Sequence, residues 1–121
     1  MVNTIIEVIK SGANKANVLG APGRPYLTYG GLLAHVEATV TALNERGIGR
    51  NDRVAIVLPN GPEMASAFIT VAAGATTAPL NPSYREEEFD FYLSDLDAKA
   101  LIVEKGSSSP ALAVASQHDI P

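Results

Sequence analysis

The sequence predicts an α/β fold: a three-layer βαβ unit with a mostly parallel sheet, preceded by a helix and a β-hairpin. Three short apolar runs, at residues 53–58, 76–80 and 99–103, have the length and composition of buried strands. A segment with apolar residues three and four apart precedes each run. Strands that alternate with helices form parallel crossovers, so one sheet covered on both faces is expected.

The first expected elements are a helix and a hairpin. Thr4 and Glu7 have capping-box spacing, and three nearby isoleucines share one helical face. Residues 17–19 and 25–27 flank a Gly-Ala-Pro-Gly-Arg turn at 20–24, which predicts two antiparallel strands.

A long helix is expected between Thr28, as its N-cap, and Gly47, just beyond its end. Its apolar stripe comprises Leu32, Leu33, Val36, Val40 and Leu43. The strand at 53–58 follows after a tight connection and ends at Pro59.

The next helix is predicted from a capping pair, Asn60 and Glu63, with Pro62 in the first turn, and Gly74 ends it. Its expected packed face comprises Met64, Ala67, Phe68, Val71 and Ala72.

Ser83 is the expected cap of a fourth helix, whose first turn holds Glu86, Glu87 and Glu88 at the positive end of the helix dipole. Its inner face comprises Phe89, Tyr92, Leu93 and Leu96. A short last helix at 110–116 leads to residues 118–121, which have the pattern of an approach to another strand.

Composition restricts the classes of function. The chain has 121 residues and a net charge of -4, with no basic stripe for a phosphate backbone, so no nucleic-acid partner is expected. It has no cysteine, which excludes disulfides and cysteine chemistry within it. The start, 1–10, lacks the pattern of a secretory signal, and the apolar stretch at 64–80 is too often interrupted for a membrane span.

Three segments carry a family resemblance. Residues 27–32 read Leu-Thr-Tyr-Gly-Gly-Leu, residues 49–63 contain Asp-Arg-Val-Ala-Ile-Val-Leu-Pro-Asn, and residues 73–84 end in Pro-Leu-Asn-Pro-Ser-Tyr. Together they resemble the AMP-forming adenylating enzymes, which include acyl-CoA synthetases, luciferases and adenylation domains. Asn51 stands where that family usually has glycine. Residues 88–100 resemble the oxalyl-CoA synthetase and fungal peroxisomal branch.

The resemblance implies an N-terminal fragment, with 1–121 a single partial domain: helix and hairpin at 1–27, alternating helices and strands at 28–121. The parent would be an acid–CoA ligase that uses ATP, Mg²⁺ and CoA. The family's phosphate loop, its Tyr-Gly-x-Thr-Glu segment, its ribose-binding aspartate and its C-terminal lysine have no counterpart here. No catalytic residue is therefore expected, the chain alone is predicted to be inactive, and no cofactor is expected to bind it tightly.

The loop at 81–85 is the candidate site. It follows a predicted parallel strand, and such strand ends face ligand crevices. By resemblance Arg85 would contact a CoA phosphate, although an arginine at a helix start is more often simply solvated. Asn81 and Pro82 are expected to hold the shape of the loop.

Other candidates have structural interpretations. The 20–24 turn sits in a hairpin rather than between strand and helix, so it does not predict a phosphate cradle. His35 and His118 lack partners at ligand spacing, and no metal site is predicted. Ser107–Ser109 has no adjacent base and reads as a solvated loop. Glu86–Glu88 diverge around the helix and cannot converge on one cation.

Two alternatives remain. One is a stand-alone module that binds CoA or a nucleotide, or pairs with a subunit, without catalysis. The other is an unrelated flavodoxin-like domain, disfavoured because no phosphate loop follows the first strand. Expected partners are the rest of a synthetase chain or a second copy, with a carboxylic acid as the parent's substrate. The expected location is the cytoplasm, or the peroxisome in a eukaryote.

Overall fold

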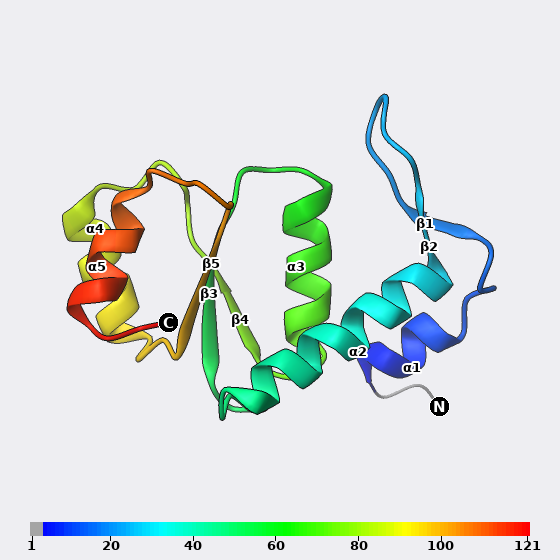
Figure 1. The fold of residues 1–121 in the computed structure, drawn as a ribbon, viewed down its shortest axis with the longest axis horizontal. Helices are drawn as coiled ribbons and strands as arrows, with labels where there is room; N and C mark the ends of the chain where they lie inside the picture. The colour runs from blue at the N-terminus through cyan, green and yellow to red at the C-terminus, as the bar shows by residue number, and fades with distance from the viewer. Residues whose placement is uncertain (1–3) are drawn as a thin grey trace.

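The computed structural model describes residues 4–121, and the prediction about a secretory signal falls partly outside them. Its elements are arranged in three layers, with a sheet between two sets of helices (Figure 1). In chain order they are α1 (Ile5–Lys10), β1 (Asn17–Leu19), β2 (Leu27–Thr28), α2 (Tyr29–Glu45), β3 (Arg53–Val57), α3 (Pro62–Ala72), β4 (Thr76–Pro79), α4 (Glu86–Asp95), β5 (Ala100–Val103) and α5 (Pro110–Gln117).

The central sheet has the order β4-β3-β5, and both pairings are parallel, as predicted. The chain passes from β3 to β4 on one side and then crosses to β5 on the other. Ala55 of β3 lies opposite Ala78 and Leu101. The central strand is buried from Val54 to Val57, which explains its continuous apolar run.

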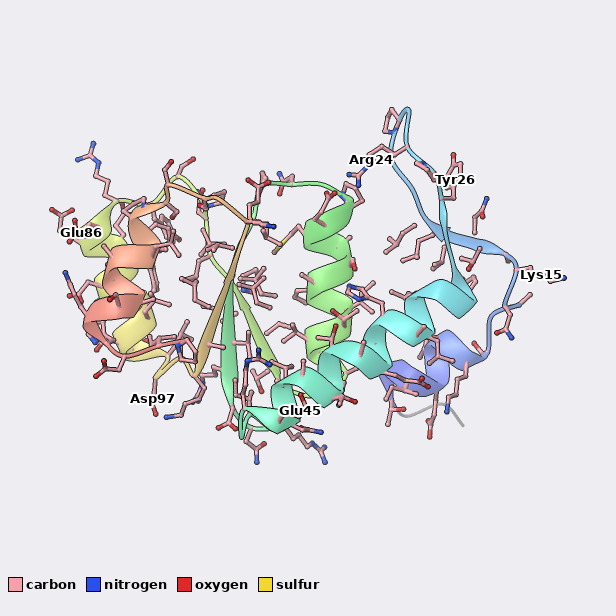
Figure 2. All side chains as sticks on the ribbon, viewed as in Figure 1. Lys15, Arg24, Tyr26, Glu45, Glu86 and Asp97 are labelled. Carbon is pink, nitrogen blue, oxygen red and sulfur yellow. The ribbon has the colours of Figure 1, made fainter. Side chains whose placement is uncertain are left out.

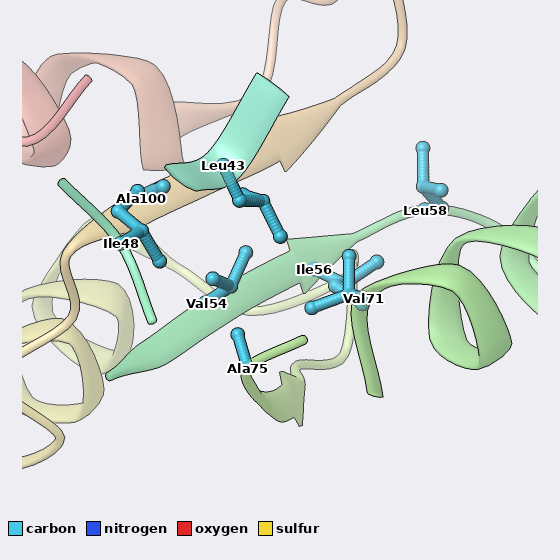
Figure 3. Close-up of a cluster of buried hydrophobic side chains, with 8 residues drawn as sticks. All are labelled: Leu43, Ile48, Val54, Ile56, Leu58, Val71, Ala75 and Ala100. Atoms are coloured by element: carbon cyan, nitrogen blue, oxygen red, sulfur yellow. The ribbon is translucent and has the colours of Figure 1, made fainter. Parts of the chain in front are cut away.

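Alternate residues of β3 supply two separate cores. Val54 and Ile56 pack with Leu43 of α2 and Val71 of α3 on one face, as Figure 3 shows. Ala55 and Val57 face the other side. There they join a cluster that comprises Phe89, Leu93, Ala98, Ala111 and Val114, from α4, α5 and the turn after α4. Helices therefore cover both faces of the sheet, and this confirms the three-layer prediction.

The N-terminal elements form a third cluster against α2. Thr4 and Glu7 make the predicted capping box of α1, and Ile9 is buried beside Leu32 and Val36. The hairpin is antiparallel as expected, but its second strand is Leu27–Thr28 rather than 25–27. Pro25 has no N–H to donate to a ladder, so the pairing begins later.

Both ends of α2 are as predicted. Gly31 N–H donates to Thr28 Oγ1 at 3.1 Å, which satisfies one free amide of the first turn. At the other end Gly47 has φ 76°, the left-handed conformation that glycine adopts without strain. Ile48 N–H donates to the Leu43 carbonyl at 2.9 Å, and these two side chains meet in the core, which completes a Schellman motif.

Two predictions for α3 are wrong. The N-cap is Gly61, not Asn60, because Pro62 occupies the first helical position and places Glu63 one residue short of a capping box. Phe68 is 43% exposed rather than packed, while Thr70 is buried. The Thr70 hydroxyl donates to the Ala67 carbonyl at 3.3 Å, so its burial leaves no unpaired polar atom.

The N-cap of α4 is Arg85 rather than Ser83, so that prediction is also wrong. The Arg85 N–H donates to the Glu88 carboxylate at 3.1 Å, and the three glutamates fill the first turn as expected. Within residues 4–121, no helix combines the length and apolar character that crossing a bilayer requires.

Candidate functional site

The carboxyl ends of β3 and β4 meet at one edge of the sheet, and the chain leaves them in opposite directions. Residues 58–61 lead to α3, which packs on the face of Val54 and Ile56. Residues 80–85 lead to α4, which packs on the opposite face. Ligands of open parallel sheets bind where neighbouring strand ends diverge in this way. This edge is therefore the candidate site.

A groove of about 530 Å³ lies between the two diverging loops. Its polar side chains are Asn60, Asn81 and Ser83, and none of its lining residues is ionisable. The remaining lining comes from Leu58, Pro59, Met64, Pro79, Leu80 and Pro82. The groove therefore offers an apolar wall with two amides and a hydroxyl at its rim.

The loop from Asn81 to Tyr84 has its own hydrogen bonds. Ser83 N–H donates to Asn81 Oδ1 at 2.9 Å, and Tyr84 N–H donates to the Asn81 carbonyl at 3.1 Å. An asparagine that accepts from the second residue along forms an Asx-turn. This confirms that Asn81 holds the shape of the loop.

Aromatic packing fixes the far end of the same loop. The Tyr84 ring stacks on the Tyr92 ring with centroids 5.1 Å apart, and it forms a T-shaped pair with the Phe89 ring with centroids 5.7 Å apart. A hydrogen bond with Tyr92 and burial both raise the pKa of the Tyr84 hydroxyl, so Tyr84 is neutral at physiological pH. Ring packing therefore ties the loop to α4.

Arg85, the predicted contact for a CoA phosphate, follows this loop but does not line the groove. Its side chain is exposed, and three exposed glutamates come directly after it in the chain. The structure thus places Arg85 beside the candidate site rather than in it. Its role toward CoA remains a prediction.

The glycine-rich 20–24 segment is a hairpin turn, as expected. Arg24 N–H donates to the Ala21 carbonyl at 3.1 Å, and Gly23 has φ 73°. The Arg24 side chain extends from this turn toward the start of α3 (Figure 2) and forms an ion pair with Glu63. The guanidinium holds the pKa of the Glu63 carboxyl below its usual range. Sequence spacing alone did not indicate this pair, because its members are 39 residues apart.

The histidines and serines have local structural roles. His118 Nε2 lies 2.7 Å from Asp90 Oδ1 and joins α5 to α4, while His35 is exposed on α2. In the part of the chain that the structure describes, no three side chains of a metal-binding type converge. The prediction of a purely solvated serine loop is wrong for Ser109, which caps α5 by accepting from Ala111 N–H at 3.2 Å.

Comparisons with known proteins agree on one family. A family model described as AMP-binding enzyme matches residues 9–120. Among curated proteins, an oxalate–CoA ligase of Arabidopsis thaliana is 41% identical over 104 residues, which is 84% of this chain and 20% of that protein. The yeast Saccharomyces cerevisiae has an oxalate–CoA ligase that is 42% identical over 81 residues, 64% of this chain and 15% of that protein. The chain thus spans about a fifth or less of the length of these relatives.

The fold is also that of solved structures. Apo MatB from Rhodopseudomonas palustris matches with a TM-score of 0.82 at 19% identity, over 98% of this chain and 24% of that one. The N-terminal subdomain of NpsA from Klebsiella oxytoca matches with a TM-score of 0.71 at 25% identity, over 88% of this chain and 28% of that one.

Proposed function

This chain belongs to the AMP-binding enzyme family, and from that premise we propose that it is the N-terminal portion of an ATP-dependent, AMP-forming acid–CoA ligase. The parent would adenylate a carboxylic acid with ATP, which releases pyrophosphate, and then transfer the acyl group to CoA, which releases AMP. The observation that carries this proposal is the family match over residues 9–120, and the groove at the diverging ends of β3 and β4 lies within that region. This portion would supply one wall of the parent's ligand-binding region.

We propose further that these 121 residues have no ligase activity alone. Adenylation builds negative charge around the transferring phosphorus, which must be stabilised by cations or aimed N–H groups. The groove lining offers amides and a hydroxyl but no lysine, arginine or carboxylate. The lining therefore does not fit ATP with Mg²⁺, and no catalytic step is assigned to it.

Oxalate is the first acid to test. The two oxalate–CoA ligases share 41% and 42% identity with the aligned parts of this chain. Residues 88–100, in α4 and the start of β5, resemble that branch in particular. This supports the choice of substrate without assigning any residue of the groove to it.

The direct test measures pyrophosphate release with ATP, Mg²⁺, CoA and a panel of carboxylic acids that includes oxalate. The pure 121-residue chain should show no release above a heat-treated control. A longer chain from the same gene, extending into a phosphate loop, should be active. Turnover by the short chain would overturn the proposed inactivity, and a longer chain inactive on every acid would count against the ligase.

A non-catalytic module that binds CoA or a nucleotide, or pairs with a subunit, is the rival proposal. The same samples separate the two, because such a module would bind CoA or a subunit in calorimetry whether or not a longer chain exists.

For the parent we propose a cytoplasmic location, with the peroxisome as the eukaryotic alternative. A fluorescent fusion of the full gene product tests this location.

A further inference from the structure

The hairpin of β1 and β2 projects from the rest of the molecule and ends in a tip, residues 20–26 (Figure 1). The ladder beneath the tip has only two residue pairs, and its register shifts between them. Residues 22–26 are exposed, and Tyr26 is 65% exposed. A segment with so short a ladder and so much exposure depends on few contacts for its position.

The base of the hairpin, in contrast, is fixed to the N-terminal core. Leu19 and Leu27 pack against the cluster that contains Leu32 of α2. Beside them, Tyr29 N–H donates to the Ala16 carbonyl at 3.0 Å. Movement of the tip would therefore hinge where the ladder ends, and the base would stay in place.

Contacts within the tip join its two arms into one unit. The Tyr26 ring lies across Gly20 and leaves no room there for a β-carbon. Arg24 N–H donates to the Ala21 carbonyl at 3.1 Å, which closes the turn. The tip therefore keeps its shape when it moves.

One ion pair connects the tip to another element. Within residues 4–121, the Arg24–Glu63 pair is the only hydrogen bond or salt bridge between the tip and a residue outside the hairpin. Both side chains are more than half exposed. An exposed ion pair shifts an equilibrium by up to about fivefold, so this pair favours one position of the tip without fixing it there.

The tip covers a small pocket beside the start of α3. The pocket has a volume of about 210 Å³, and Pro25 of the tip and Ser66 of α3 both line it. Arg24 and Glu63 are the only ionisable side chains among its lining residues, so no other charge there competes for either partner. The residue after Glu63 is Met64, which lines the candidate groove. The ion pair therefore lies on the helix that supplies one wall of that groove.

We propose that residues 20–26 form a hinged arm, which the Arg24–Glu63 ion pair latches against the first turn of α3. With the pair formed, the tip covers the pocket. With the pair broken, the tip swings away and opens the pocket to solvent. Salt weakens an exposed ion pair, so a higher ionic strength shifts the tip toward the open position. This inference does not depend on the ligase proposal, because it concerns a movement within this chain alone.

Pairs of spin labels test the latch, because the chain has no cysteine of its own. Pro22→Cys places one label on the tip, and Phe68→Cys places the other at an exposed position of α3. Asn17→Cys with Phe68→Cys is the matched reference pair, because Asn17 is exposed on β1 at the base of the hairpin. Double electron–electron resonance measures both distances, and circular dichroism verifies that each labelled protein is folded.

Arg24→Gln should lower the ratio of closed to open tip by up to about fivefold, seen as a gain of longer distances between positions 22 and 68. Added salt should act in the same direction on the natural sequence and have little effect on the variant. Glu63→Gln should match Arg24→Gln, and the double variant should add nothing further. Lys15→Gln, which removes an exposed charge near the base of the same hairpin, should leave the distance unchanged.

Three results would overturn the proposal. If neither Arg24→Gln nor salt changes the distance between positions 22 and 68, side-chain packing holds the tip and there is no latch. If the distance between positions 17 and 68 changes equally, the whole hairpin moves and there is no hinge at the end of the ladder. If the double variant loses the sum of the two single losses, the two charges act independently rather than as a pair.

Discussion

Val40 of α2 packs directly over Gly74, just beyond the end of α3. A β-carbon at position 74 would lie 2.9 Å from Val40 Cγ2 and 3.1 Å from its Cγ1. Val40 is β-branched and on a helix, so its side chain has little freedom to move away. Gly74 is therefore required for the close contact of two helices, a different role from the simple helix stop that the sequence suggested.

Gly74→Ala should destabilise the chain by about 1–3 kcal/mol, the usual cost of an added methyl in a packed contact. Gly49→Ala is the control, because a β-carbon there meets nothing within 4 Å and its φ is not in the left-handed region. Urea unfolding of both variants measures the difference. Equal stability of the two variants would show that α2 shifts away from α3 at little cost.

The Ser109 cap gives a second prediction. Ser109 Oγ accepts from Ala111 N–H, while its neighbour Ser108 is exposed and its side chain forms no hydrogen bond within residues 4–121. Ser109→Ala should cost about 1 kcal/mol through loss of the N-cap, and Ser108→Ala should be close to neutral. Thermal unfolding, supported by the helical signal in circular dichroism, compares them. A neutral Ser109→Ala would mean that water replaces the cap without loss.

These two positions show what the sequence can and cannot predict. The order and type of the elements from Thr28 onward follow from local periodicity, and the structure agrees with them, although the predicted N-caps of α3 and α4 are wrong by one and two residues. The N-cap role of Ser109 could be predicted from its immediate neighbours, since a serine before Pro110 has the N-cap pattern. Three consecutive serines are also typical of an open loop, however. The packing role of Gly74 could not be predicted in this way, because Val40 comes into contact with it only when the two helices pack together.

The candidate site likewise has parts that local sequence predicts and parts that depend on the tertiary fold. The parallel strand before residues 81–85 predicts a ligand-facing edge, and the Asx-turn of Asn81 is a local property. Residues 58–60, which form the opposite wall, are brought there by the order β4-β3-β5. That order is not a property of any one segment, so the sequence indicated only one side of the groove.

The Arg24–Glu63 ion pair predicts a pH effect. The Arg24 guanidinium donates to the Glu63 carboxylate and lowers its pKa in the folded chain. A lowered folded pKa means that the pair stabilises the chain fully above the unfolded value of about 4.3. This contribution is lost as the pH falls through the folded pKa. Both side chains are more than half exposed, so salt should weaken the effect.

Carboxyl NMR titration of Glu63 measures this directly. Its midpoint should lie below the ordinary range in the natural sequence and rise toward that range in Arg24→Gln. Arg46→Gln is the control, because Arg46 bonds to the Ala42 carbonyl and should leave the Glu63 midpoint unchanged. The ion pair has no role in solution if Arg24→Gln leaves the titration of Glu63 where it was.

The last prediction concerns Arg85 in the parent enzyme. A charge-assisted hydrogen bond is worth about 1.5–3 kcal/mol, so Arg85→Ala should raise the KM for CoA by roughly 10-fold or more if it contacts a CoA phosphate. Arg50→Ala is the matched control, because Arg50 precedes β3 at the amino ends of the strands, away from the groove.

Repeating the measurement with 3′-dephospho-CoA identifies the phosphate. If Arg85 binds the 3′-phosphate, the variant and the natural enzyme should have similar KM values for the dephospho compound. If it binds the pyrophosphate, the loss should persist with both compounds. The KM for ATP should not change in either case, since a contact confined to CoA contributes nothing to adenylation. An Arg85→Ala enzyme with an unaltered KM for CoA would show that Arg85 is an ordinary solvated residue at the start of α4.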